Sequence, residues 1–489
     1  MEQTQEHEKR FAGYLSVPRT AELPEAPPYR FSNIMRIIGP GAILLGLSIG
    51  SGEWLLGPAA TVKWGLALLW VTAVSVVLQV ILNTEMARYT LYTGEPIVTG
   101  FMRTAPGPRF WGWCYSILYF LQVGWPGWAA TAGGALAFIY LGHLPAAEEA
   151  GLVKAYGYGT LFGAAAILLL GRKIERTLEY VNWFFIAWIL IFLLVLDLFV
   201  VPASKWVEGF VGFFRFGTIP QGADWFLLAA FAGYSGAGGM LNVSITNWLR
   251  DKGFGMGAQV GYIPALVGGR RVTVSHEGAV FDVKNPQNMA RWRSWWRYLA
   301  ADQYWLWMGG AFLGMFLPTI LATTVIEPGT DIRGLGVAAR IADGVSTVTG
   351  SAALRLLTAM TGFWILFSTQ LGIMDGFIRN ITDTLWTGSP AVRRWRGGDV
   401  RAVYYTVWSL LLVWGCIAIN LAQPIVLIQL GAAMASLIFV FVAIHTFVVN
   451  RRFLPPELRP PAWRQAALWA SAVFFGIFAG FWLYRNFIA

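Results

Sequence analysis

Long apolar runs constrain this chain more than any other feature of its sequence. Eleven runs approach or exceed the roughly 20 residues that an α-helix needs to cross the hydrocarbon core of a bilayer. Hydrophobic residues fill 56% of the 489 positions, which is more apolar surface than a soluble domain of this length can bury. We therefore expect an all-α, multi-pass protein of the cell (inner) membrane. The runs are 33–62, 66–92, 109–142, 157–171, 177–202, 223–249, 302–327, 353–381, 402–421, 424–448 and 464–487.

The distribution of Lys and Arg predicts how these runs are oriented. If the N-terminus is cytoplasmic and the sides alternate, 28 of the 36 basic residues fall inside and eight fall outside. Such an excess is typical of cytoplasmic loops, so we expect a cytoplasmic N-terminus and a C-terminus on the outer face. The net charge of +10 then reflects topology, and no nucleic acid partner is expected. The outer eight are Lys63, Lys154, Lys205, Arg215, Arg333, Arg340, Arg355 and Arg485.

The runs divide the chain into two groups of five spans. Residues 1–32 form a polar cytoplasmic tail, 33–202 hold the first group, 223–448 hold the second, and 464–487 form an eleventh span. A polar insert at 250–301 interrupts the second group. Within the insert, the alternation over 271–283 predicts a small hairpin. The stretch Arg291–Arg297 is typical of an amphipathic segment at the inner lipid surface, and we assign the insert no chemistry.

Glycine clusters interrupt the first span of each group. The first span contains Gly46-Leu-Ser-Ile-Gly-Ser-Gly-Glu53, and the sixth contains Phe231-Ala-Gly-Tyr-Ser-Gly-Ala-Gly-Gly239. Each glycine costs a helix about 1 kcal/mol relative to alanine, and opened backbone inside a bilayer is tolerated only against protein or a cavity. Matched interruptions in two halves indicate an inverted-repeat transporter with helices one and six broken and the binding site between them. Glycine used only for close helix packing is the alternative.

Glu53 is the ionisable residue placed nearest the middle of a span. It follows Gly50-Ser51-Gly52 directly and has no basic residue within a helical turn, so it is a candidate to carry a proton or to bind a cation, including a metal ion. Capping of freed amides is its alternative role. Asn242 and the stretch Trp125–Trp128 are further polar or aromatic candidates. The candidate substrate-binding set is Gly50, Ser51, Gly52, Glu53, Tyr234, Ser235, Gly236, Ala237, Gly238 and Gln370, the last beside Ser368 and Thr369.

Other ionisable residues in the spans lie closer to helix ends. Glu85 with Arg88, Asp375 with Arg379, Asp197 and His445 are therefore expected to pair at the interface or to extend toward it. Cys114 and Cys416 lie inside apolar runs and predict neither a disulfide framework nor a metal cluster.

Several of these stretches resemble Nramp-type divalent-metal transporters. They are Gly39-Pro-Gly41, Ile49-Gly-Ser-Gly-Glu53, Lys63-Trp-Gly65, Leu68-Leu-Trp70 and Met374-Asp-Gly-Phe377. The resemblance, over about residues 33–450, implies a LeuT-type 5+5 inverted repeat within the amino acid–polyamine–organocation superfamily. It also implies transport of a divalent metal such as Mg²⁺ or Mn²⁺, with a proton as coupling ion.

The chain departs from this family at the residues that bind metal. The family's Asp-Pro-Gly-Asn motif falls on Gly50–Glu53, and its Met-Pro-His on Gly236–Gly238, which offer neither sulfur nor imidazole. The acidic residues that the family uses on its third helix are not evident around 125–135. Transition metals prefer soft or imidazole ligands, whereas a hard cation such as Mg²⁺ can use one carboxylate, carbonyls and its own waters.

Two functions follow from these observations. The first is a Nramp-related secondary transporter that moves a small cationic solute by alternating access through a site centred on Glu53. The second is a carrier of a small organic solute, of amino acid or amine type, because 49–52 and 231–234 also resemble the broken helices of amino acid transporters. We expect no enzyme activity, no cofactor beyond a transported divalent cation or coupling proton, and no obligate protein partner besides the lipid bilayer.

Overall fold

The computed structural model describes residues 2–269, 274–332, 336–421 and 424–488, and its regular structure is almost entirely helical. Eight helices within this described part are long and apolar enough to cross a membrane. The three remaining predicted runs form one shorter helix and two divided ones, so the chain follows the eleven runs of the sequence. The prediction of an all-α membrane protein is confirmed.

The first five spans run from α3 to α10. Two further elements belong to this part of the chain, namely α2 (Phe31–Ile37) before span one and the 3₁₀ turn η2 (Leu66–Leu68) before span two. The spans are: one, α3 (Pro40–Ser48), η1 (Ile49–Leu56) and α4 (Gly57–Trp64); two, α5 (Leu69–Thr93); three, α7 (Pro108–Val123) and α8 (Gly127–Leu141); four, α9 (Ala150–Ile167); five, α10 (Ile174–Val200).

The second group and the eleventh span complete the bundle. Spans six to eleven are: six, α12 (Trp225–Tyr234) and α13 (Met240–Lys252); seven, α15 (Pro286–Ala300), η4 (Ala301–Met308) and α16 (Gly309–Val325); eight, α18 (Ala352–Gly388); nine, α20 (Val400–Ala418); ten, α21 (Pro424–Phe453); eleven, α22 (Ala462–Phe487). Span three is divided at Gly124–Pro126, an interruption that the sequence analysis did not single out. Span four begins seven residues earlier than predicted.

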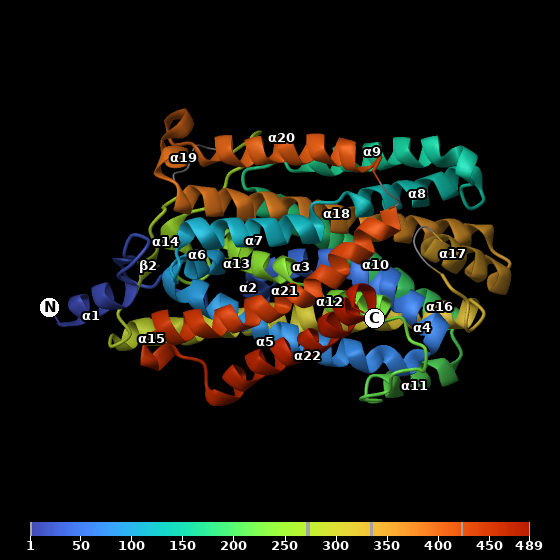
Figure 1. The fold of residues 1–489 in the computed structure, drawn as a ribbon, viewed down its shortest axis with the longest axis horizontal. Coiled ribbons are helices and arrows are strands. Elements are labelled where there is room, and N and C mark those ends of the chain that lie inside the picture. The colour runs from blue at the N-terminus through green and yellow to red at the C-terminus, as the bar shows by residue number, and fades with distance from the viewer. Residues whose placement is uncertain (1, 270–273, 333–335, 422–423, 489) are drawn as a thin grey trace.

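The connections gather at two ends of the bundle (Figure 1). One end, called the tail side below, carries α1 (Glu2–Phe11), β1 (Arg19–Thr20), α6 (Ile97–Met102), α14 (Gly257–Val260), β2 (Ala279–Val280) and α19 (Pro390–Arg394) with the turn η5 (Trp395–Gly397). The opposite end, called the far side, carries α11 (Ala203–Gly212) and α17 (Gly336–Thr349). Two short turns, η3 (Ala147–Glu149) and η6 (Pro456–Leu458), join spans three to four and ten to eleven.

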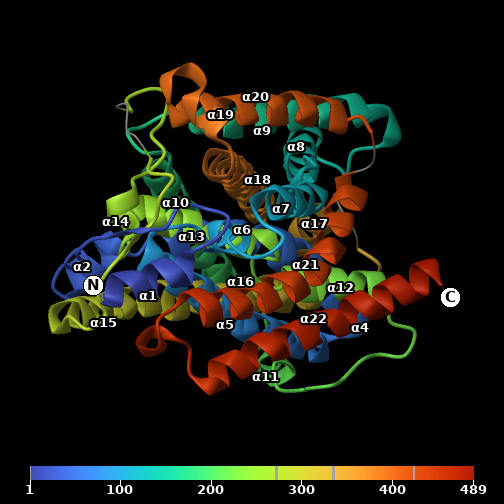
Figure 2. The same ribbon diagram turned by 60° about the vertical axis from the view of Figure 1, so that its left-hand side comes forward.

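Span one occupies the centre of the bundle. Its most apolar window is 100% buried by the rest of the protein, against 28% for span nine at the periphery. Spans three, four, eight and nine lie together in one part of the bundle, where Figure 2 shows α8, α9, α18 and α20 side by side. A helix surrounded by protein can carry polar groups that lipid would not tolerate, so this position suits a functional span.

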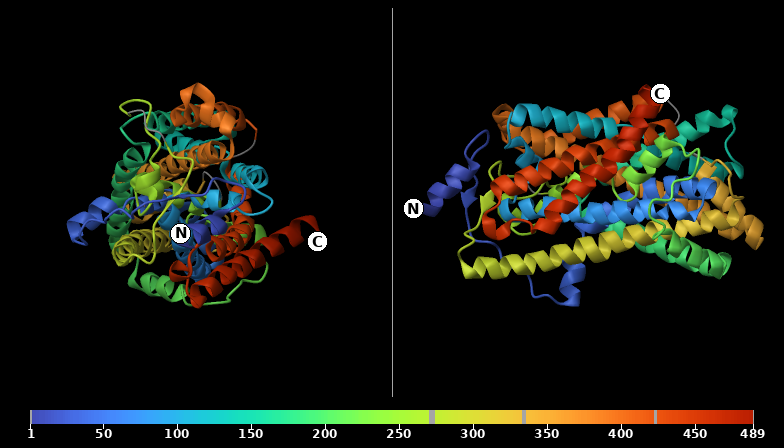
Figure 3. Two further views of the ribbon diagram at one scale, coloured as in Figure 1. Left: turned by 90° about the vertical axis from the view of Figure 1, so that its left-hand side faces the viewer. Right: turned by 60° about the horizontal axis from the view of Figure 1, so that its bottom comes forward.

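The insert at 250–301 differs from its prediction in two ways. The stretch Arg291–Arg297 does not lie along the membrane surface, because α15 continues through η4 into α16 as one long helix, seen at the bottom of the right-hand view in Figure 3. The predicted hairpin partly falls on 270–273, which lie outside the described residues. Its described strand, Ala279–Val280, pairs in parallel with Arg19–Thr20 of the tail. Tail and insert therefore form one layer on the tail side.

Candidate functional site

The break predicted in span six is confirmed. Helix α12 ends at Tyr234, α13 begins at Met240, and Ser235 between them has extended backbone (φ −66°, ψ 91°). Three glycines of this segment have positive φ, a conformation that side-chain-bearing residues rarely adopt. The segment therefore depends on glycine for its path. The three are Gly236 (φ 108°), Gly238 (φ 95°) and Gly239 (φ 49°).

Two glutamine side chains replace hydrogen bonds that the opened backbone has lost. Gln79 of span two accepts from the Ala237 amide (3.1 Å) and donates to the Ser235 carbonyl (2.6 Å). Gln122 of span three accepts from the Met240 amide (2.8 Å) and donates to the Gly238 carbonyl (2.8 Å). Buried backbone groups must be paired in this way to avoid a large desolvation cost. The opened segment is thus a built feature of the fold.

Span one is interrupted differently from the expectation. Its glycine cluster does not unwind, because Ile49–Leu56 forms a π-helix that continues from α3 into α4. Such widened turns are frequent at functional sites. The glycines here permit close approach to other spans: a β-carbon on Gly50 would lie 1.7 Å from Thr369 Oγ1. The Ser51 side chain lies outside the described residues.

Glu53 meets the opened backbone of span six. Its carboxylate oxygen Oε1 accepts a hydrogen bond of 3.0 Å from the Gly236 amide, and the side chain is fully buried. The second oxygen, Oε2, has no hydrogen-bond partner among the described residues. The predicted association of Glu53 with span six is therefore present, with one carboxylate oxygen engaged and one available.

Further unpaired polar atoms belong to side chains that contact the segment 234–242. Asn242 donates to Gln79 (3.2 Å), and its oxygen Oδ1 has no partner in the described part of the chain. The buried indole N–H of Trp128 is equally unpaired there, and its ring lies 6.1 Å from that of Tyr234. Unpaired buried polar groups are rare in folded proteins. Together with Glu53 Oε2 and the Tyr234 hydroxyl, which is also unpaired among the described residues, they offer a solute two acceptors, one donor and one hydroxyl that can act as either.

Three other candidate residues use their polar side-chain atoms in hydrogen bonds to the protein itself. Ser235 pairs its hydroxyl with that of Thr72 (3.0 Å), and Gln370 accepts from the Ala129 amide (3.1 Å), which joins span eight to span three. Trp125 donates to the Leu121 carbonyl within its own span. Trp128 is therefore the indole that faces Tyr234.

A row of buried, hydrogen-bonded polar side chains, called the polar file below, leads from the site toward the tail side. Asn242 donates to Asn83 (2.8 Å), and Asn83 donates to Gln303 (3.1 Å). Gln303 donates to Asp302 (2.8 Å), whose other oxygen accepts from the Gly39 amide at the start of span one (2.9 Å). The sequence analysis missed these residues, although Gln79 and Asn83, four residues apart in an apolar run, carried a signal.

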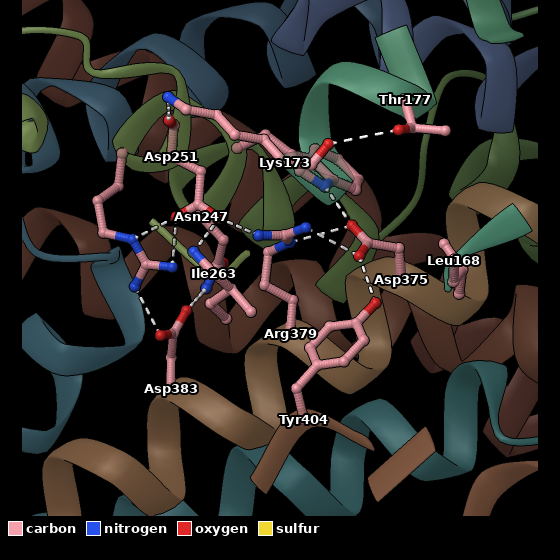
Figure 4. A network of polar contacts seen from close by, with 12 residues as sticks. Leu168, Lys173, Thr177, Asn247, Asp251, Ile263, Asp375, Arg379, Asp383 and Tyr404 are labelled. Carbon is pink, nitrogen blue, oxygen red and sulfur yellow. Dashed lines mark hydrogen bonds and ion pairs between the residues drawn. The ribbon is translucent and has the colours of Figure 1, made fainter. Parts of the chain in front are cut away.

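Two of the four interfacial predictions are confirmed as pairs, although both are buried. Arg88 binds Glu85 (2.7 Å), and Arg379 binds Asp375 (2.9 Å). The second pair belongs to a network on the tail side that Figure 4 shows. In this network Asp251 forms an ion pair with Arg379, and Asp383 forms one with Arg250. This network ties the tail-side half of span six to span eight.

The expectation for Asp197 is wrong, whereas His445 is paired but buried. Asp197 is fully buried, and neither carboxylate oxygen has a hydrogen-bond partner among the described residues. His445 is buried between Thr104 and Tyr115, each 2.8 Å from one ring nitrogen. The burial of both residues was not predicted, because depth along a span does not reveal which face of a helix is covered by protein.

The donor set fits a hard cation better than a soft one. No group of three or more His, Cys, Asp or Glu side chains in the described part of the chain is arranged to hold a metal ion. Glu53 is the acid at the site, and the atoms around it are amide and backbone groups. Cations that keep several waters and use one carboxylate match such a set.

The helix arrangement and the contact at Glu53 show what kind of protein this is. It is a multi-pass α-helical membrane protein with the LeuT-type inverted repeat, in which spans one and six meet at an interrupted segment. This confirms the fold expected from the paired glycine clusters. No protein-family model and no curated protein sequence matches the chain.

Several solved structures share this fold. A crystal structure of a variant of the Eremococcus coleocola manganese transporter has a TM-score of 0.63 and 15% identity, covering 95% of this chain and 89% of that one. The same transporter in complex with an aromatic bis-isothiourea substituted compound gives 0.60 and 14%. Mhp1, a nucleobase-cation-symport-1 family transporter in a closed conformation with bromovinylhydantoin bound, gives 0.52 and 13%, covering 92% and 93%.

Proposed function

We propose that this protein is a secondary active transporter that moves a small cationic solute by alternating access, with Glu53 as the cation-binding carboxylate. The observation that carries the proposal is the contact between Glu53 and the Gly236 amide, which places a buried acid on opened backbone within the bundle. A charge at this depth is costly and is retained where it serves transport. Half-helix ends and freed carbonyls add the partial charges that hold ions.

A divalent cation such as Mg²⁺ or Mn²⁺ is the solute class that we favour. Glu53 Oε2 and Asn242 Oδ1 are acceptors without a partner among the described residues, and hard cations take oxygen ligands. The shared fold with a manganese transporter supports this choice, together with the resemblance at 39–70 and 374–377. A coupling proton on Glu53 is part of the proposal.

A small organic solute is the second candidate. The indole of Trp128 against the ring of Tyr234 provides an aromatic wall beside opened backbone, and aromatic side chains bind planar or cationic organic groups. The shared fold with a transporter that binds a hydantoin supports this alternative.

Uptake into proteoliposomes tests the two candidates. We expect saturable uptake of Mg²⁺ or Mn²⁺ by the intact protein, and uptake at the level of empty liposomes for Glu53→Gln. Glu208→Gln is the matched control, because Glu208 is an exposed far-side acid paired with Lys205. Uptake of an amino acid or amine without any of Mg²⁺, Mn²⁺ or Ca²⁺ would favour the second candidate. Unchanged cation uptake by the Glu53 variant would contradict the role given to this residue.

We also propose that the tail side is cytoplasmic in the cell (inner) membrane. The basic loops lie on that side by sequence, and the tail and insert form one layer there. A reporter fused to the N-terminus should be cytoplasmic, and one fused to the C-terminus should be external. Two reporters on the same side would contradict an odd number of spans.

A further inference from the structure

Two buried carboxylates lie at the tail-side end of span five. Glu175 and Glu179 are one helical turn apart on α10, with relative exposures of 1% and 6%. Residues four apart share one face of a helix, and this face is turned toward the start of span one. Sequence analysis did not select them, because Glu175 stands just before the apolar run 177–202 and Glu179 is only its third residue.

The charges of this pair are not balanced. Lys252 of α13 contacts Glu179, and its ammonium lies 3.7 Å from Glu175 Oε1. It is the single cation in ion-pair contact with either acid in the part of the chain that the structure describes. Glu175 Oε1 accepts no hydrogen bond there. Two carboxylates against one ammonium leave one negative charge uncompensated, and burying an unpaired charge is strongly unfavourable.

The pair lines a cavity next to the start of span one. The cavity has a volume of about 370 Å³ and includes both acids and Lys252. Span one packs directly on Glu179: a β-carbon on Gly39 would lie 1.7 Å from its Oε1. The Gly39 amide also donates to Asp302, where the polar file from the site ends. The carboxyl pair and the file therefore meet at the same glycine.

We propose that Glu175 and Glu179 hold one shared proton and form the site from which the transporter releases its coupling proton on the tail side. While the start of span one packs on Glu179, one acid is protonated and donates to the other, which remains ionised and paired with Lys252. When the start of span one separates from Glu179, water reaches the pair and the proton dissociates to the cytoplasmic solution. This deepens the proposed function, since it supplies the coupling ion with an exit on the tail side.

Other charged groups near the pair set its electrostatic surroundings. Arg36 and Arg176 line the same cavity at exposed positions, and the Lys173 ammonium donates to the Asp251 carbonyl. Asp302 approaches from span seven, and Asp251 is already paired with two arginines. None of these groups forms an ion pair with either glutamate among the described residues. The pair therefore still consists of two carboxylates with one contacting ammonium. Besides Lys252, the cationic groups in the cavity lining are Arg36, Lys173 and Arg176.

Infrared difference spectroscopy of the purified protein between acid and alkaline pH tests the proposal without any transport measurement. The intact protein should show the carbonyl stretch of one protonated carboxylic acid that is absent from both Glu175→Gln and Glu179→Gln. Either substitution leaves one carboxylate against one lysine, which needs no proton. Lys252→Met should strengthen the band instead, because it removes the compensating charge.

Three outcomes would overturn the proposal. The band could persist in both glutamine variants, it could be lost in only one of them, or Mg²⁺ could remove it from the intact protein, which would indicate a metal site. Circular dichroism and thermal melting establish that each variant is folded, and Glu179→Asp, which keeps the charge, should retain the band. Glu53→Gln should leave the band difference intact, so failure of the proposed function and failure of this inference are distinguishable.

Discussion

The Gly52 backbone lies so close to the Tyr234 carbonyl oxygen that a β-carbon on Gly52 would be 1.6 Å from it. At Gly52, one residue before Glu53, the backbones of spans one and six are therefore in direct contact. This contact sets the depth at which the carboxylate reaches the Gly236 amide.

Gly52→Ala should separate the two spans. The methyl group has no room against a backbone carbonyl, and overpacking of this kind costs about 1–3 kcal/mol. We expect a lower melting temperature in detergent and loss of uptake. Gly480→Ala is the control, since no atom lies within 4 Å of its added β-carbon, and it should melt like the parent. Equal melting of the two variants would show that spans one and six are not in this contact.

Gln79→Leu should destabilise the opened segment of span six. The substitution removes the partner of the Ala237 amide and one of the two partners of the Ser235 carbonyl, which still accepts from Ser75. An unsatisfied buried group costs about 1–3 kcal/mol. Thermal unfolding should detect the loss, with Gln287→Leu, an exposed position on α15, as the comparison. A melting temperature equal to that of the control would mean that the segment does not depend on this amide.

Arg379→Met should be among the most destabilising single changes on the tail side. It leaves Asp251 and Asp375 without their shared guanidinium, and breaking a buried ion pair costs about 3–5 kcal/mol. Arg401→Met removes a more exposed pair with Asp399 and should cost no more than about 1 kcal/mol. Adding Asp375→Leu to the first variant should restore part of the stability. An additive double variant would contradict coupling within the network of Figure 4.

Asp197→Leu should stabilise the protein. The acid is buried, and its oxygens find no hydrogen bond in the described part of the chain, so an apolar side chain removes a desolvation cost of about 1–3 kcal/mol. Glu148→Leu at an exposed far-side position should change the melting temperature little. A lower melting temperature for the Asp197 variant would show that this acid is satisfied in the folded protein.

Residue patterns along the chain were enough to predict the number of spans, the alternation of their connections and the place of the break in span six. These features are local: a bilayer requires about 20 apolar residues for each crossing, and a run such as Gly236–Gly239 cannot remain helical at low cost. Local pattern also singled out Glu53, because no basic residue stands near it in the chain.

The contacts between spans could not be predicted from these patterns. Gln79 and Gln122 pair with the opened backbone, and Glu175 shares Lys252 with Glu179, through contacts between residues far apart in the sequence. The π-helix of span one was also hidden, because the same glycines are compatible with unwinding or with close packing. Hydropathy indicates whether a residue tolerates lipid. Its hydrogen-bond partners depend instead on which surfaces of the helices pack together. That information exists only once the spans are packed.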